Sequence, residues 1–64
     1  MKYLTVMNIA GEIYRVYKTA NSPERAERLA RIEVARQKGL IPSPWAVHPS
    51  DIKTREITGH SFTN

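Results

Sequence analysis

The absence of cysteine from a chain of 64 residues is the strongest constraint on its fold. A domain of about 60 residues buries only about 60% of the surface that its unfolded chain exposes, and disulfides or zinc sites stabilise many domains of this size. A chain without cysteine has neither a disulfide framework nor a thiolate metal site, so stability has to come from the packing of one thin apolar core or from a partner. We therefore expect one domain over residues 1–58 and a flexible C-terminal tail over residues 59–64.

The clearest local signal is a helix that starts at a Ser-Pro pair. Ser22 can accept a hydrogen bond from a free amide of the first turn, and Pro23 has the fixed φ that suits the first helical position. Gly39 suits the left-handed position that follows the end of a helix. The sequence thus predicts a helix over residues 23 to about 38, with a shallow, alanine-rich apolar stripe that can lie close against a sheet.

Charged side chains along this helix suggest local and distant ion pairs. Two acidic residues stand four positions before a basic one, the favourable order on a helix: Glu24 with Arg28 and Glu27 with Arg31. Glu33 falls within the apolar stripe instead. We expect Glu33 to pair with Lys53 or Arg55, or to mark a contact made only in a complex.

The segment before the helix is typical of a β-hairpin. Residues 3–19 are rich in Tyr, Val, Ile and Thr, and Ala10-Gly11 interrupts them. A two-residue loop would place Leu4 and Val6 on one face with Arg15. A three-residue loop, with Gly11 at a positive-φ bulge, would group them with apolar residues of the second strand.

We favour the bulged register, because it gives one apolar face for the helix to cover. That face would carry Leu4, Val6, Tyr14 and Val16. The opposite face would carry Tyr3, Thr5, Met7, Ile13, Arg15 and Tyr17. This opposite face is too apolar for an ordinary solvated surface, so we expect it to be covered or used in binding.

A third strand is expected after a proline-containing segment. Pro42 and Pro44 prevent continuation of the helix and place residues 45–47 in an extended conformation. Residues 50–57 fit either a strand or a short capped helix. The chain is therefore predicted to have an α+β fold with the order ββαβ, in which a three-stranded antiparallel sheet carries one helix packed on one face.

The sequence offers no catalytic or metal-binding constellation. His48 lies in a loop and His60 in the predicted tail, and Ser50, His48 and Asp51 are too close in the chain to converge as a triad. Two isolated histidines without cysteine supply no zinc site. No apolar run suits a signal peptide or a membrane span. We expect a cytoplasmic binding protein, not an enzyme, with no cofactor, metal, membrane contact or small-molecule substrate.

The charge favours a polyanionic partner, since ten Lys and Arg residues against six Asp and Glu residues give a net charge of +4. The uncovered sheet face is the first candidate site. Its Tyr3, Arg15 and Tyr17 would interleave aromatic rings with positive charge, as sheet surfaces that hold single-stranded nucleic acid do. The alternative is a homodimer in which two such faces, or two edge strands, bury one another.

Two further candidate sites lie outside that face. Arg25 and Arg36 flank the apolar stripe of the helix and form a second possible basic patch, with Lys38 close by. Trp45 is the largest apolar side chain and can anchor either a core or an interface. We favour closure of the core over the helix end for Trp45.

The hairpin followed by Ser22-Pro23-Glu24-Arg25-Ala26, a helix and a last strand resembles the very short host-interaction proteins encoded by bacteriophages. Residues 36–44 are also similar to the helix-to-wing passage of phage excisionases, whose N-terminal part is helical where this chain is β-rich. The first resemblance implies a stand-alone protein that occludes or redirects a host enzyme, and it transfers no functional residues. The leading hypothesis is a phage or mobile-element binding protein that engages nucleic acid or a nucleic-acid enzyme. The alternative is a module that inhibits a host protein without contacting nucleic acid.

Overall fold

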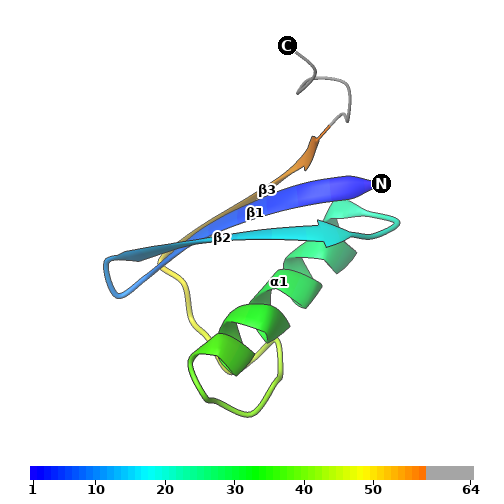
Figure 1. Ribbon diagram of the computed structural model, residues 1–64. Helices are drawn as coiled ribbons and strands as arrows, with labels where there is room; N and C mark the ends of the chain where they lie inside the picture. The colour runs from blue at the N-terminus through cyan, green and yellow to red at the C-terminus, as the bar shows by residue number, and fades with distance from the viewer. Residues whose placement is uncertain (58–64) are drawn as a thin grey trace.

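The computed structural model describes residues 1–57 and confirms the predicted α+β order ββαβ. Its elements are β1 (Lys2–Ile9), β2 (Glu12–Thr19), α1 (Pro23–Gln37) and β3 (Asp51–Ile57). The strands form one antiparallel sheet in the order β2-β1-β3, and α1 lies against one face of it (Figure 1). The segment of residues 50–57, for which the sequence allowed either a strand or a short helix, thus forms a strand over Asp51–Ile57, β3. The tail expected at residues 59–64 lies outside the described residues.

The hairpin closes with a two-residue loop, so the predicted bulged register is wrong. Ile9 pairs with Glu12, and both loop residues have positive φ, 53° for Ala10 and 88° for Gly11. This is the I′ type of turn, whose twist matches the right-handed twist of the flanking strands. The side chain of Asn8 supports the turn by accepting a hydrogen bond from the Gly11 amide at 2.9 Å.

This register reverses the predicted allocation of β1 to the two faces of the sheet, because a shift of one residue turns every side chain of a strand over. The β1 residues on the helix side are Tyr3, Thr5, Met7 and Ile9, all of them buried. Leu4 and Val6 lie on the other face, so their predicted packing against the helix is wrong. Tyr14 and Val16 of β2 do pack on the helix side, as predicted.

The core is thin because the helix contributes mainly small side chains. Its buried residues are Ala26, Ala30, Val34 and Ala35. They meet β1 and β2 in two clusters, one around Met7 and Val34 and the other around Tyr3 and Ala26. The helix therefore approaches the sheet closely, and Thr5 beneath it bonds through its hydroxyl to that of Thr54 on β3 at 2.8 Å.

Both predicted helix ends are confirmed. The Ser22 hydroxyl accepts a hydrogen bond from the Arg25 amide at 3.2 Å. At the other end Gly39 has a φ of 77°, and the Leu40 amide donates to the Ala35 carbonyl at 2.9 Å. This pattern is the Schellman motif, in which a left-handed glycine lets the chain reverse and satisfy the last carbonyls.

Residues 38–50, which we name the strap, connect α1 to β3. The strap turns at Pro44 and Trp45, where the Ala46 amide donates to the Ser43 carbonyl at 3.2 Å, so the predicted extended conformation is wrong for Trp45 and Ala46. Val47 then enters the core with only 3% of its surface exposed. The strap thus closes the core under the sheet and delivers the chain to β3.

Replacing the capping hydroxyl tests the helix start. We expect Ser22→Ala to lower the free energy of unfolding by about 1 kcal/mol, because one first-turn amide loses its acceptor. Urea unfolding followed by circular dichroism measures the change. Asn21→Ala is the control, since that side chain makes no hydrogen bond within residues 1–57. Equal stability of Ser22→Ala and the wild type would contradict this assignment.

The hairpin turn generates a second prediction about stability. Ala10 holds a left-handed conformation that costs an alanine about 1 kcal/mol or more, whereas asparagine tolerates it. Ala10→Asn should therefore raise the free energy of unfolding by about 1 kcal/mol. Gly11→Ala should lower it, since the φ of 88° strains any side chain. A destabilised Ala10→Asn variant would contradict the two-residue turn.

Candidate functional site

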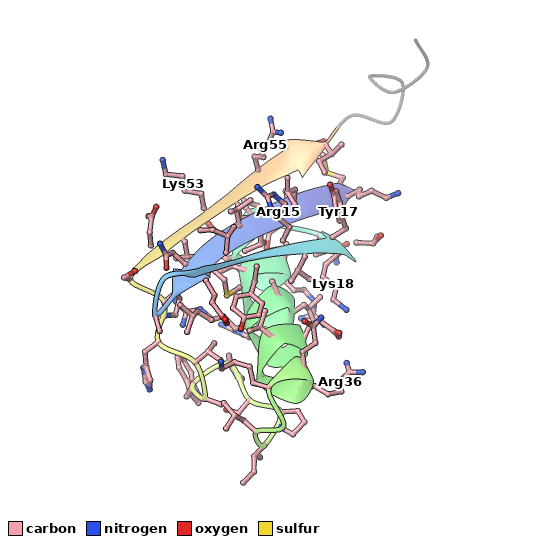
Figure 2. The ribbon with its side chains drawn as sticks, turned by 60° about the vertical axis from the view of Figure 1, so that its left-hand side comes forward. Arg15, Tyr17, Lys18, Arg36, Lys53 and Arg55 are labelled. Carbon is pink, nitrogen blue, oxygen red and sulfur yellow. The ribbon has the colours of Figure 1, made fainter. Side chains whose placement is uncertain are left out.

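The sheet face turned away from α1 is the main candidate site, which we call the open face. Its central positions are Leu4, Val6, Arg15, Tyr17, Lys53 and Arg55. Its margins are Lys2, Asn8, Ile13, Thr19, Asp51 and Ile57. Figure 2 shows Arg15, Lys53 and Arg55 on β2 and β3, on the side of the sheet away from the helix.

The register arranges the open face in rows across the three strands. Val6 lies between Arg15 and Lys53, and in the next row Leu4 lies between Tyr17 and Arg55. An apolar strip along the central strand is thus bordered on both sides by long polar or aromatic side chains. Alternation along strands makes this possible, because every second residue points to the same face.

Exposure on this face is uneven. Tyr17 is 59% exposed, so its ring is available for stacking, whereas Leu4 between its two row partners is only 8% exposed. Arg15 and the two basic residues of β3 are exposed. A hollow lies over the strip on the β3 side, lined by Leu4, Val6, Lys53, Thr54 and Arg55.

The central basic residues of the open face make no ion pair with an acidic group of residues 1–57. Within residues 1–57 the ion pairs all lie on the helix side: Lys18 with Glu33 at 3.6 Å, Arg31 with Glu27 at 3.3 Å and Arg36 with Glu33 at 2.8 Å. In this described part of the chain Arg15, Lys53 and Arg55 form none. Asp51 is the single acidic residue on the open face of the described chain, and it stands at the margin. The open face is therefore locally positive.

Glu33 organises the charges on the helix side. Its carboxylate accepts hydrogen bonds from Gln37 at 3.2 Å and from Arg36 at 2.8 Å, and it pairs with Lys18 across to β2. The hydrogen bond from Gln37 and the charges of Arg36 and Lys18 lower the pKa of Glu33 below its ordinary value, against the raising effect of partial burial. The predicted pairing with Lys53 or Arg55 is wrong, because the sheet separates them.

Tyr3 does not belong to the open face. It is 4% exposed and packs with Ala20 and Ala26 under the helix. The expectation that it lies beside Arg15 and Tyr17 is therefore wrong, for the same reason of register. Lys53 and Arg55 are the residues that the sequence reasoning missed. Their spacing of two within a predicted strand already placed them on one face.

The proposed basic patch of the helix is dispersed. Arg25 and Arg36 stand eleven positions apart in α1, which at 1.5 Å per residue is about 16 Å. Arg36 is neutralised by Glu33, and Figure 2 shows it with Lys18 on the helix side of the sheet. Lys38 lies 5.7 Å from the centre of the Tyr14 ring. These three residues do not form one surface.

Trp45 does not close the core. Its side chain is 75% exposed, and Val47 closes the core in its place. Trp45 and Pro44 line a hollow together with a row of charged helix residues: Glu24, Glu27, Arg28 and Arg31. Of the two predicted helix ion pairs in this row, the Glu27–Arg31 pair is formed, and Glu24 makes none with Arg28.

The described residues lack two further features. No cluster of three or more His, Asp or Glu side chains in this part of the chain is suited to hold a metal ion. Among the same residues, no helix combines the length and apolar character that crossing a membrane requires.

Comparison of the chain with protein-family models, with curated proteins and with solved structures found no match.

The lowered pKa of Glu33 predicts an acid-sensitive contribution to stability. The folded chain binds this proton less readily than the unfolded chain, so the ionised carboxylate stabilises the fold above its ordinary pKa of 4.5, and this contribution is lost as the pH falls through the lowered value. Glu33→Gln should flatten that part of the dependence of unfolding free energy on pH. Urea titrations between pH 3 and 7 measure it, with Glu24→Gln as the control for loss of a charge. An unchanged slope would contradict the assignment.

Proposed function

We propose that this chain is a non-enzymatic protein that binds nucleic acid through its open face. The observation that carries the proposal is the grouping of Arg15, Lys53 and Arg55, all without an ion pair in the described chain, around an apolar strip with an exposed Tyr17 beside it. Cationic side chains supply contacts to phosphates, and an exposed aromatic ring supplies a stacking surface for a base. The open face presents both together.

The division of charge between the two sides of the sheet supports this proposal. On the helix side, Lys18, Arg31 and Arg36 are engaged by Glu27 and Glu33. The open face keeps its positive charge for a partner. Much of the moderate net charge of +4 is therefore concentrated on the open face. Its electrostatic field attracts polyanions and raises the rate at which they encounter the protein.

The same charge argues against a second copy of the chain as the occupant of the open face. Two open faces in contact would bring Arg15, Lys53 and Arg55 of one copy against those of the other. Like charges across an interface cost about several kcal/mol, and among residues 1–57 only Asp51, at the margin of the face, would oppose them. A polyanion can contact the apolar strip and the basic side chains of the open face without this repulsion between like charges.

A second candidate function is the binding of a protein through the strap. Ile41 and Trp45 are 82% and 75% exposed, and exposed apolar groups of this size are common anchors of protein interfaces. This candidate corresponds to a module that inhibits a host protein. The two functions differ in salt dependence, because phosphate contacts weaken steeply as salt rises and a mainly apolar interface does not.

Removing one cation of the open face tests the proposed function. Arg55→Ala should weaken binding of a labelled oligonucleotide and reduce the slope of log affinity against log salt by about 0.7 to 0.9, as expected for one lost phosphate contact. Anisotropy titrations at several salt concentrations measure both quantities. The matched control is Arg28→Ala, which removes the same charge from an exposed helix position.

Two results would count against this proposal. Equal effects of Arg55→Ala and Arg28→Ala would mean that only the total charge matters. Absence of binding at low salt would exclude nucleic acid as the ligand and leave the protein partner of the strap as the better account.

A further inference from the structure

We infer that the open face accepts unpaired bases of a single-stranded nucleic acid, with one base over the hollow of Leu4 and Val6 and a neighbouring base on the ring of Tyr17. The inference rests on the proposed function and names its substrate class. Its starting observation is that the hollow and the exposed ring lie on opposite sides of the same central strand.

The hollow has the composition that a nucleobase requires. Val6 and the small exposed part of Leu4 give it an apolar floor, and Lys53 and Arg55 border it with aliphatic stems that end in cationic groups. A base is flat and weakly polar on its two faces, while the phosphates on either side of it are anionic. The floor therefore suits the face of the base, and the cationic groups suit its flanking phosphates.

The spacing of the sheet fits two successive nucleotides. Neighbouring strands lie about 4.8 Å apart, so the middle of the hollow, between β1 and β3, is about 7 Å from the β2 strand that carries Tyr17. Lys53 and Arg55 are two positions apart on one strand, which is about 6.6 Å. This distance is comparable with the step between successive phosphates of an extended single strand. One backbone along β3 can therefore present one base to the hollow and another toward Tyr17.

A duplex cannot use these features. In a double helix the faces of the bases are covered by stacking, and a protein reaches only phosphates and base edges in the grooves. Tyr17 and the apolar strip of Leu4 and Val6 would then contribute nothing to affinity. Recognition through stacked bases is how sheet surfaces hold single strands, because unpaired bases can be splayed onto aromatic side chains.

Four labelled probes of equal length test the inference. They are a single-stranded DNA octamer, the RNA octamer of the same sequence, the duplex of the DNA octamer with its complementary DNA strand, and an octamer of abasic sites that keeps the phosphates. We expect the single strands to bind more tightly than the abasic and duplex probes, by about 5- to 150-fold for each stacked base. Tyr17→Ala should remove about one such factor, and Tyr17→Phe should restore it. The DNA and RNA probes identify the preferred sugar.

The hollow has its own readout in methyl NMR spectra of the wild type. A base seated there should shift the methyl resonances of Leu4 and Val6 upfield through its ring current, while Val34 and Val47 on the helix side stay unchanged. The abasic probe should leave all four in place. Equal affinity for the single-stranded, abasic and duplex probes, or unshifted Leu4 and Val6 methyls with bound single strand, would overturn the inference and leave the proposed function standing. Failure of every probe to bind at low salt would overturn the proposed function itself.

Discussion

The two-residue turn at Ala10-Gly11 is the constraint on which the arrangement of this molecule depends. Both residues adopt positive φ, and the strands that leave the turn pair without a bulge. That register alone decides which side chains of the hairpin meet the helix. Met7 and its neighbours of the same parity form the core, whereas Leu4 and Arg15 are turned to the other face. A single inserted residue at the turn would place Leu4 and Val6, instead of Met7 and its neighbours on β1, on the face that carries Tyr14 and Val16.

The second consequence of this register is a separation of charge by the sheet. Glu33 lies where it can engage Lys18 of β2, and the sheet keeps it away from Arg55. Carboxylates of the helix thus neutralise cations on their own side only. The same register therefore produces both the thin core and the positive open face. A helix rich in alanine packs closely against one face of the sheet and leaves the other face uncovered.

The order of elements and both helix ends could be predicted from the sequence, because capping by Ser22 and reversal at Gly39 depend on residues close to them in the chain. The two faces of the hairpin could not. An apolar strip on the open face, with Leu4 at its centre, makes either register look acceptable by hydrophobicity. The turn type depends on Ala10 adopting a conformation that is uncommon for alanine. Exposure of Trp45 also escaped prediction, because Val47 fills the place in the core that the tryptophan was expected to take.

The central claim of the proposal is that nucleic acid binds at the open face and not on the helix side of residues 1–57. Its most direct test is the rate of lysine acetylation, measured by mass spectrometry with and without a saturating single-stranded oligonucleotide. Lys53 borders the hollow of the open face, whereas Lys38 lies beside Tyr14 on the helix side. The account predicts that the bound oligonucleotide slows acetylation of Lys53 several-fold and leaves Lys38 unchanged. Protection of Lys38 with no protection of Lys53 would contradict it.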